Sequence, residues 1–342
     1  MKGAPTMMPH VRFGLIGLGY WGPKLARNLE ALPQASLEIV ADLSPASLNR
    51  AKQERPWITT TSRIEDVFES DVDAVVIATP VSTHFELARK ALLHGKHVLV
   101  EKPLTADVAE AEELVALARR QNRILMVGHT FQYSPAIREL RQLIQDGELG
   151  NIYCIEIERL NLGLYRSDID VIWDLAPHDA SILLALLGES PIGTTAHAHG
   201  HLHSKIYDIA HINLEFPSGT TAHIHVSWLH PDKVRKVTVI GDKRMAIYDD
   251  TNPAEMLKIF NKGADVGVDP IVSYRYGAIT IPHIEWSEPL RLECEDFARA
   301  IRTGEQPAAN GEVGLEVVKM LTAAQESLRA RKAGQAELAG AR

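Results

Sequence analysis

Glycines near the N-terminus are spaced as in a phosphate-binding turn. The turn follows the apolar run Val11–Ile16, which predicts a strand, and precedes a helical pattern over Tyr20–Ala31. Its residues are Gly17, Leu18, Gly19, Tyr20, Trp21 and Gly22. Bare backbone at glycines can approach a pyrophosphate at the positive N-terminus of a helix. A tight turn that binds nothing is the alternative for the motif alone, but strand, turn and helix together predict a dinucleotide site.

An acidic residue, Asp42, ends the next predicted strand about 20 residues after Gly22. Its carboxylate can accept a hydrogen bond from a hydroxyl of an adenosine ribose, and its charge would repel a 2′-phosphate. Leu43 and Ser44 offer no cation to offset that charge. The position therefore favours NAD over NADP, although Arg50 in the following helical pattern leaves NADP open.

Two further segments follow predicted strands at the same edge of the sheet. Ligands of open α/β sheets bind outside the carboxyl ends of the strands, so the residues after Ala74–Ala78 and His97–Val100 are expected beside the nucleotide turn. The candidates for cofactor contact there are Thr79, Pro80, His84, Glu101 and Lys102. A lysine is costly to bury without a function, and a solvated loop lysine is the alternative.

An aspartate and a histidine four residues apart, Asp174 and His178, suit proton transfer near the start of a helix predicted over Pro177–Leu187. Oxidation of an alcohol by NAD removes a proton as the hydride leaves, and a histidine with a pKa near ~6.5 can accept it when a carboxylate orients the ring. The alternative is that Asp174 caps the helix and His178 only packs. Asp179 either contacts substrate hydroxyls or complements the helix dipole.

The elements that must position these residues form two domains, with the first predicted over residues 1–128. Short apolar runs alternate there with helical patterns, which predicts a parallel Rossmann sheet of βαβ units. The expected strands are Val11–Ile16, Leu37–Ala41, Ala74–Ala78, His97–Val100 and Ile124–Val127, and the expected helices are Tyr20–Ala31, Ser44–Glu54, Thr83–His94 and Asp107–Gln121.

The second domain, predicted over residues 129–342, is of the α+β class and is built on an open, mostly antiparallel sheet. Its later strands, from Ile209 onward, follow one another through short turns at Pro217-Ser218-Gly219 and Gly241-Asp242, which favours antiparallel pairing. The strands are Ile152–Arg159, Ile209–Phe216, Thr220–Trp228, Val234–Ile240 and Arg244–Tyr248, and the helices are Pro135–Gln145, Pro177–Leu187, Pro289–Thr303 and Val313–Arg331. Residues Ala333–Arg342 are expected to be a frayed tail.

Composition excludes several functions for the chain. It has 36 Lys and Arg against 44 Asp and Glu, a net charge of −8, which disfavours nucleic-acid binding. Its apolar runs fall short of the ~20 residues needed to cross a membrane. Cys154 and Cys294 lie far apart without a zinc-ligand spacing, so a reducing compartment is expected. The N-terminus lacks the pattern of a signal peptide. These features predict a cytoplasmic protein that binds a small molecule.

Histidines alternate along two predicted strands and would project from one face of the sheet. They are His197, His199, His201 and His203 in the first group and His223 and His225 in the second. Imidazole clusters can bind zinc or copper. No acidic residue or cysteine completes an obvious site, so we predict no metal and interpret the pattern as a polar sheet face at a subunit contact.

The chain resembles the glucose-fructose oxidoreductase, inositol dehydrogenase and rhizopine-catabolism (Gfo/Idh/MocA) oxidoreductases. The similarity covers nearly the whole chain and lies in GLIGLGYWG, ATPVSTH, GKHVLVEKPLT, the Asp174/His178 pair and EPLRLECEDF followed by GLEVV. The resemblance implies a nucleotide-binding domain followed by an open mixed sheet, and a dimer or tetramer. It also implies that Lys102 and Pro103 shape the nicotinamide site, that Lys102 reaches the reacting hydroxyl, and that His178 is the base that Asp174 positions.

The segment before Asp174 departs from the glycine-rich run of many relatives and reads Tyr165–Trp173 here. In this it is similar to members associated with polysaccharide and sugar-nucleotide synthesis, which favours a nucleotide-linked sugar oxidised at a secondary hydroxyl, as by a UDP-sugar 3-dehydrogenase. Arg166 could then face a diphosphate or carboxylate, or it is an exposed loop arginine.

Three alternatives stay open besides the nucleotide sugar. The first is an inositol or free-sugar dehydrogenase. The second is an NAD-dependent glycosidase, which would show no net NADH. The third is a nucleotide-sensing regulator. This alternative is disfavoured because the chain has Lys102, Asp174 and His178 together.

Overall fold

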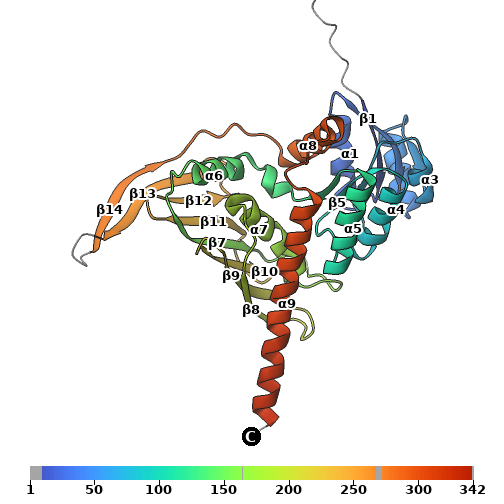
Figure 1. The fold of residues 1–342 in the computed structure, drawn as a ribbon. Helices are drawn as coiled ribbons and strands as arrows, with labels where there is room; N and C mark the ends of the chain where they lie inside the picture. Colours follow the sequence, from blue (N-terminus) through green and yellow to red (C-terminus); the bar gives the residue numbers. More distant parts are fainter. Residues whose placement is uncertain (1–9, 164, 267–271, 341–342) are drawn as a thin grey trace, which may run out of the picture. The chain divides into compact units, whose positions relative to one another are not determined.

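The computed structural model describes residues 10–163, 165–266 and 272–340, which form two compact units (Figure 1). Unit 1 comprises the described residues of Met1–Tyr133 together with Ser287–Val318, and unit 2 comprises Ser134–Trp286 and Lys319–Arg342 as far as they are described. The long helix α9 (Gly311–Gly340) begins in unit 1 and continues into unit 2. No helix among the described residues is both long and apolar enough to cross a membrane.

Unit 1 is built on a six-stranded parallel sheet in the order β3-β2-β1-β4-β5-β6. The strands are β1 (Val11–Ile16), β2 (Ala35–Ala41), β3 (Thr59–Thr61), β4 (Ala74–Ile77), β5 (His97–Glu101) and β6 (Leu125–Gly128). The chain reverses its direction across the sheet between β1 and β4, so their carboxyl ends meet where ligands of such sheets bind. The sequence did not indicate β3, because three threonines carry no apolar pattern.

The helices of unit 1 cover its sheet. They are α1 (Gly22–Glu30), α2 (Pro45–Glu54), α3 (Glu65–Glu69), α4 (His84–Leu93), α5 (Val108–Gln121) and α8 (Pro289–Thr303), with the 3₁₀ turns η1 (Val81–Thr83) and η2 (Thr130–Tyr133). Asp107 caps α5, accepting from the backbone N–H groups of Ala109 and Glu110.

Helix α8 belongs to unit 1, whereas the sequence placed it in the second domain. Its buried side chains share one core with β1 and α1, and the rings of Phe297 and Phe13 lie 5.9 Å apart. The division of the chain falls after Tyr133, five residues beyond the expected boundary at 128, and residues 287–318 return to the first unit. This correction reflects burial of apolar side chains against a strand nearly 300 residues earlier, which local pattern does not reveal.

Unit 2 is built on an eight-stranded sheet in the order β14-β13-β12-β11-β7-β10-β9-β8. The strands are β7 (Ile152–Leu160), β8 (Gly193–His199), β9 (Ile209–Glu215), β10 (Thr221–Ser227), β11 (Val234–Gly241), β12 (Met245–Asp249), β13 (Leu257–Val266) and β14 (Val272–Thr280). All neighbours pair antiparallel except β7 and β10, which are parallel.

The expected pairing of β10 with β11 is wrong, because β7 lies between them. The connection of residues 228–233 contains Pro231 rather than a tight hairpin turn, and it is long enough to pass over one strand about 4.8 Å wide. Strands β13 and β14 were not expected from the sequence, whereas β8 contains His197 and His199 of the predicted histidine strand.

One face of the sheet in unit 2 is covered by α6 (Pro135–Gln145) and α7 (Val171–Leu187) (Figure 1). Ile155, Ile157 and Ile224 are buried on that face, while alternate residues of the same strands, including His223, are exposed on the other. The helix α9 continues through the expected frayed tail to Gly340, since RKAGQAELAG is rich in helix-favouring residues.

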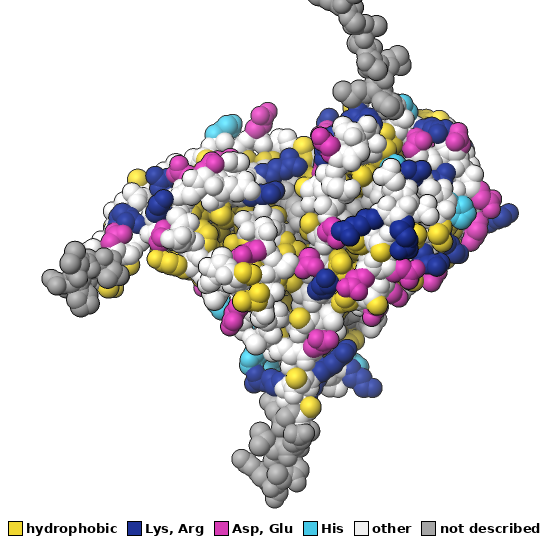
Figure 2. Space-filling model, in the orientation of Figure 1, with side chains coloured by type: hydrophobic (Ala, Val, Ile, Leu, Met, Phe, Trp, Pro, Cys, Tyr) yellow, Lys and Arg dark blue, Asp and Glu magenta, His cyan; other side chains and the backbone are white. Residues whose placement is uncertain are grey.

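Charges of both signs are interspersed on the surface that Figure 2 shows, with no extended basic field. That face therefore does not have the electrostatic footprint of a nucleic-acid-binding protein.

Candidate active site

The glycine turn in unit 1 needs its glycines for three different reasons. Gly17 has a φ of +98°, and a Cβ there would lie 2.5 Å from the carbonyl oxygen of Ala78. A Cβ on Gly22 would lie 2.1 Å from the carbonyl oxygen of Gly17, so this glycine allows α1 to start against the turn. A Cβ on Gly19 would meet nothing within 4 Å, which leaves open space over the backbone. The turn thus has the shape of a pyrophosphate cradle.

Asp42 closes this turn at the end of β2. Its Oδ2 accepts from the backbone N–H of Leu18 at 2.6 Å, and its Oδ1 accepts from that of Ser44 at 2.7 Å. Each carboxylate oxygen has a further lone pair for a ribose hydroxyl. The neighbouring Leu43 is exposed and brings no cation, so the environment favours an unphosphorylated ribose, as in NAD.

Replacing Asp42 by alanine is expected to shift the ratio of NAD to NADP affinity toward NADP by about tenfold or more, because a charge-assisted hydrogen bond and a repulsive charge are both lost. Titration of each cofactor by fluorescence measures the ratio. Asp71→Ala, at an exposed carboxylate paired with Arg12, is the matched control. An unchanged ratio in Asp42→Ala would contradict the role of this carboxylate.

Lys24 is a cofactor candidate that the sequence reasoning missed. Its ammonium lies 3.5 Å from the ring centroid of Tyr20 and 4.5 Å from that of Trp21, both residues of the glycine turn. Its position in the sequence, two residues after Gly22 and in the first turn of the helix, could have indicated this candidate. A cation there adds to the positive end of α1, next to the space over Gly19.

His84 has a structural role in place of the expected cofactor contact. The ring is 1% exposed, and its Nδ1 and Nε2 lie 2.8 Å and 2.9 Å from the carbonyl oxygens of Pro103 and Thr79. Burial lowers the pKa of the imidazole, while the two carbonyls oppose that shift. His84 therefore joins the loop after β4 to the Lys102–Pro103 turn, leaving Thr79 half-buried and Pro80 exposed at the sheet edge.

Glu101 also turns inward, although it was expected to line the cofactor site. Only 9% of the residue is exposed, and its Oε2 accepts from the backbone N–H of Lys102 at 3.3 Å. Burial raises the pKa of its carboxyl to about 7, against the opposing effects of the Lys102 and Lys24 ammonium groups. Lys102 itself is half-buried.

The candidate acid–base residues of unit 2, Asp174 and His178, lie in the N-terminal half of α7. The helix begins at Val171, six residues earlier than expected, and its N-cap is Asp170, whose Oδ1 accepts from the backbone N–H groups of Ile172 and Trp173. The alternative in which Asp174 caps the helix is therefore wrong. Asp174 and His178 are one turn apart on this helix, and both are half-buried.

The carboxylate of Asp174 is held by two residues from other elements. Its Oδ2 accepts from the indole Nε1 of Trp228 at 3.0 Å, and its Oδ1 lies 3.5 Å from the Arg166 guanidinium. The ring of Tyr165 packs edge-on against Trp228 at 5.5 Å. No local pattern indicates Trp228 as a partner, because it follows β10, more than 50 residues after Asp174.

Arg166 lies beside Asp174, in the loop before α7. It makes a two-pronged hydrogen bond to Asp168, at 3.1 Å and 2.7 Å, and its side chain is 42% exposed. The hydrogen bonds to Asp168 raise the pKa of the guanidinium, so the group stays charged. A charged, partly exposed arginine next to Asp174 is able to bind an anionic substrate group.

Asp179 does not fit the expected role in substrate binding, because it is completely buried. Its Oδ1 accepts from Nε and Nη2 of Arg159 on β7 at 2.8 Å and 2.7 Å, and Arg159 is itself 6% exposed. Asp179 follows His178 directly and thus ties this part of α7 to the sheet.

Replacing Asp179 by alanine is expected to destabilise the protein by about 3–5 kcal/mol, because the buried guanidinium loses its counter-charge. Urea unfolding followed by circular dichroism measures the change. The double variant Asp179→Leu/Arg159→Met, which removes both charges, should recover much of the loss. Equal stability of the single variant and the wild type would show that the pair is not required for folding.

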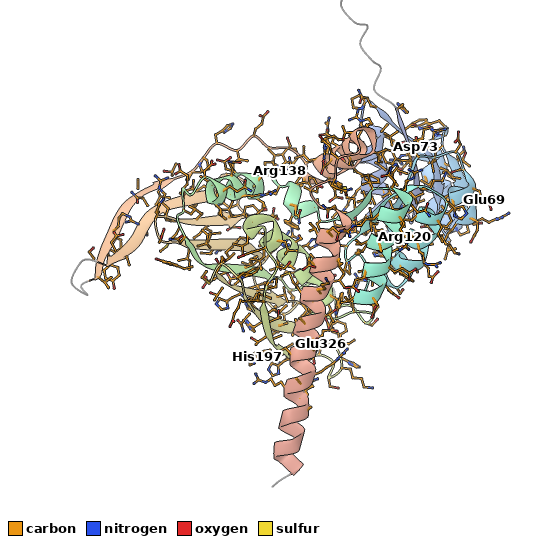
Figure 3. All side chains as sticks on the ribbon, viewed as in Figure 1. Glu69, Asp73, Arg120, Arg138, His197 and Glu326 are labelled. Carbon is orange, nitrogen blue, oxygen red and sulfur yellow. The ribbon has the colours of Figure 1, made fainter. Side chains whose placement is uncertain are left out.

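The histidines on the uncovered sheet face do not form a metal site among the described residues. His197, His211 and His225 lie directly opposite one another on β8, β9 and β10, with the last two rings stacked at 4.0 Å. His197 lies beside α9, where the Arg331 guanidinium is 2.6 Å from its Nδ1 (Figure 3). His201 is bound to Asp208 outside the strands.

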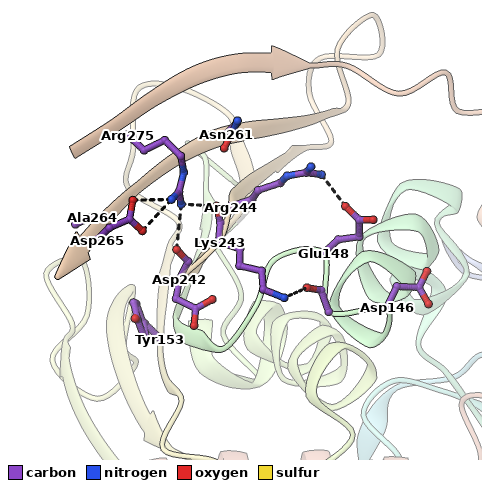
Figure 4. A pocket seen from close by; sticks show the side chains of 11 residues that line it. Asp146, Glu148, Tyr153, Asp242, Lys243, Arg244, Asn261, Ala264, Asp265 and Arg275 are labelled. Carbon is purple, nitrogen blue, oxygen red and sulfur yellow. Dashed lines mark hydrogen bonds and ion pairs between the residues drawn. The ribbon is translucent and has the colours of Figure 1, made fainter. Parts of the chain in front are cut away.

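A large hollow of about 920 Å³ lies elsewhere in unit 2, around the β11–β12 turn and the β13–β14 hairpin (Figure 4). The Arg275 guanidinium binds the Asp265 carboxylate and the carbonyl oxygens of Asp242 and Lys243, while Arg244 binds Glu148. These contacts brace the hairpin, and the cations in them are already engaged.

A doubly wound unit with a glycine turn shaped for a pyrophosphate and a carboxylate suited to a ribose hydroxyl, together with an aspartate–histidine pair in a second unit, is typical of NAD-binding oxidoreductases. Comparison with known proteins specifies the family. Residues 11–129 match the model of the oxidoreductase family with NAD-binding Rossmann fold, and residues 137–247 match the GFO/IDH/MocA C-terminal domain. The chain belongs to this GFO/IDH/MocA family, as its sequence motifs indicated.

Relatives in this family act on cyclic polyols and sugar nucleotides. The chain is 32% identical to UDP-N-acetylglucosamine 3-dehydrogenase of Acidithiobacillus ferrooxidans, over 91% of this chain and 95% of that protein. It is 26% identical to inositol 2-dehydrogenase of Rhizobium meliloti, over 94% and 98%. A crystal structure of the Acidithiobacillus ferrooxidans enzyme is similar with a TM-score of 0.79 and 29% identity, covering 94% of this chain and 98% of that one.

Proposed function

We propose that this protein is an NAD-dependent dehydrogenase that acts on a secondary hydroxyl of a nucleotide-linked sugar, of the UDP-sugar 3-dehydrogenase type. The observation that carries the proposal is the arrangement around Asp174, where Trp228 and Arg166 hold the carboxylate one helical turn before His178. Likeness along nearly the whole chain to an enzyme that acts on UDP-N-acetylglucosamine supports the substrate class.

In the proposed mechanism His178 accepts the proton of the substrate hydroxyl, and Asp174 orients the imidazole and stabilises its charged form. The ammonium of Lys102 stabilises the negative charge that develops on the oxygen. NAD, when bound, takes up the hydride. The residues suited to hold NAD are those of the glycine turn with Asp42 and Lys24, and Thr79 and Pro80 at the sheet edge.

Arg166 is the proposed contact for the diphosphate of the sugar nucleotide, since a guanidinium can bind phosphate oxygens through two N–H groups. The Asp168 carboxylate holds its charged group until substrate competes for it. A free polyol offers no anion to this arginine, which favours a nucleotide sugar over inositol.

The substrate class is tested by a panel of UDP-sugars, free sugars and inositols, each with NAD and with NADP, followed by nicotinamide absorbance. Turnover of a UDP-sugar with NAD is the expected result. Turnover of inositols or free sugars, without turnover of any UDP-sugar, would contradict the proposal that the substrate is a nucleotide sugar. Release of an aglycone without net NADH would indicate a glycosidase, and nucleotide binding without any turnover would indicate a regulator.

We also propose a homodimer or homotetramer that forms through the sheet face left uncovered in unit 2. Half-buried His225 and Glu158 on that face, and the cross-strand histidine row, support a contact there. Light scattering after gel filtration should give a mass of two or four times 37.8 kDa, and a monomer mass would contradict the proposal. The free cysteines Cys154 and Cys294 support residence in the cytoplasm.

A further inference from the structure

The buried indole of Trp228 directs its single polar atom at the carboxylate of Asp174. The residue is 2% exposed, and its Nε1–H donates to Oδ2 of Asp174 at 3.0 Å. A buried indole N–H needs a hydrogen-bond partner, and a carboxylate is a stronger acceptor than a neutral group. Apolar packing alone would need no N–H at this position. The indole nitrogen therefore indicates a role toward Asp174, the residue proposed to orient the base.

The backbone and the ring of Trp228 are both fixed. Its N–H donates to the carbonyl oxygen of Asp208 at 2.9 Å, and its own carbonyl oxygen accepts from the N–H of Gly163 at 3.1 Å. Asp208 is itself completely buried. The ring of Tyr165 packs edge-on against the indole, with the ring centroids 5.5 Å apart. The indole N–H thus has little freedom to leave the carboxylate.

The contact of Arg166 with the same carboxylate is of a different kind. Its guanidinium lies 3.5 Å from Oδ1 of Asp174, whereas a charge-assisted hydrogen bond is typically about 2.7–2.9 Å long. Its bonds to Asp168 are shorter, at 3.1 Å and 2.7 Å. The side chains of Arg166 and Asp168 are 42% and 54% exposed, so water and dissolved anions reach them. Exposed ion pairs of this type stabilise little and can exchange partners.

The two contacts behave differently when a substrate is bound. In the proposed function Arg166 binds the diphosphate, and its guanidinium then turns from the carboxylates to the phosphate oxygens. Asp174 loses the nearby cation at that moment but keeps the N–H of Trp228. A carboxylate that is bound to a fixed donor keeps its orientation while the proton is transferred.

We infer that Trp228 is a positioning residue that holds Asp174 in one orientation through the reaction, whereas Arg166 makes an exchangeable contact that passes to the anion of the substrate. The inference rests on the proposed function, in which Asp174 orients the base and Arg166 binds the diphosphate. It deepens that function by separating the permanent support of Asp174 from the contact that recognises the substrate.

The first test observes the indole N–H of Trp228 without any substrate. The chain has five tryptophans, so ¹⁵N-indole labelling gives five signals, and that of Trp228 is assigned by its loss in Trp228→Phe. In Asp174→Ala this signal should move upfield and exchange with water about tenfold faster or more, since a hydrogen bond to a charged group is lost. In Arg166→Met the signal should keep its position and exchange within about twofold of the wild-type rate, because the N–H keeps its acceptor.

Equal exchange rates in the wild type and in Asp174→Ala would overturn the inference, and so would rapid exchange in Arg166→Met. Circular dichroism reports whether each variant folds. If Trp228→Phe does not fold, replacing each of the other tryptophans by phenylalanine, one at a time, assigns the remaining signal to Trp228.

The exchangeable contact is tested with UDP, which carries the diphosphate without the linked sugar. By calorimetry, Arg166→Met should weaken UDP binding about tenfold or more, whereas Trp228→Phe should leave it within about twofold. Arg244→Met is the matched control, at an arginine of unit 2 whose side chain is 43% exposed and paired with Glu148. Equal UDP affinity of Arg166→Met and the wild type would overturn the role of Arg166. Absence of UDP binding in the wild type would overturn that role together with the proposed substrate class, while the indole signal still decides the role of Trp228.

The last test uses the substrate found in the panel. Trp228→Phe should lower kcat about tenfold or more with little change in the KM for the sugar nucleotide, and Arg166→Met should mainly raise that KM. Trp57→Phe, at a tryptophan of unit 1 that is 72% exposed, is the matched control and should change neither constant. A rise in KM with kcat unchanged in Trp228→Phe would overturn the inference. Should no sugar be turned over, the proposed function fails, while the exchange rates of the indole N–H still decide whether Trp228 holds Asp174.

Discussion

Replacing His178 by alanine is expected to lower kcat by about 10³-fold while leaving the affinity for NAD within about twofold. The residue is the proposed base, and alanine removes the imidazole that would accept the proton of the hydroxyl. The glycine turn and Asp42, which are suited to hold NAD, belong to unit 1 and are unaffected by the change. The two measurements are turnover by nicotinamide absorbance and NAD binding by fluorescence.

His94→Ala is the matched control for this variant. His94 is exposed after α4, with its Nδ1 2.8 Å from the carbonyl oxygen of Lys90, and it belongs to no part of the proposed site or of the proposed subunit contact. Its removal should leave both kcat and NAD affinity unchanged. Parallel losses of turnover and NAD affinity in His178→Ala would count against a role as base and favour a structural one.

Replacing Lys102 by methionine is expected to lower kcat by about 10²–10³-fold, because the developing charge on the substrate oxygen loses its stabilising ammonium. Methionine keeps most of the length of the side chain, so the turn after β5 and its contact with His84 should survive. Lys90→Met provides the control, at a lysine on the surface of α4 whose ammonium lies 3.8 Å from Glu65. A rise in KM with kcat unchanged would contradict this role. It would show that Lys102 binds the ground state and the transition state equally well.

The double variant Lys102→Met/His178→Ala tests whether the two side chains act in the same transition state or in separate steps. Groups that serve one transition state are strongly non-additive, so the double variant should be little slower than the slower single one. Multiplication of the two losses would show that Lys102 and His178 act in separate steps. The same stopped assay and the same substrate serve for all three variants.

Local patterns in the sequence were sufficient for many of the elements. The predicted bounds of β1 and α8 agree with the structure residue by residue, and Asp107, with which the predicted helix Asp107–Gln121 opens, is the N-cap of α5. The glycine turn could be predicted because backbone freedom at Gly17 and Gly22 is needed by the turn itself, within a few residues. The nucleotide half of the site is local in this sense, since strand, turn and helix follow one another.

Burial and strand pairing that involve residues far apart in the sequence could be known only from the tertiary structure. Asp179 is buried because Arg159 approaches it from β7, and Glu101 is buried although the carboxyl of Glu293 from α8 interacts with it unfavourably. Strand β7 lies between β10 and β11 although it comes much earlier in the chain than either of them. Burial, pKa and strand pairing are set by neighbours in space, whereas the residue types and their spacing reveal only what neighbours in sequence require.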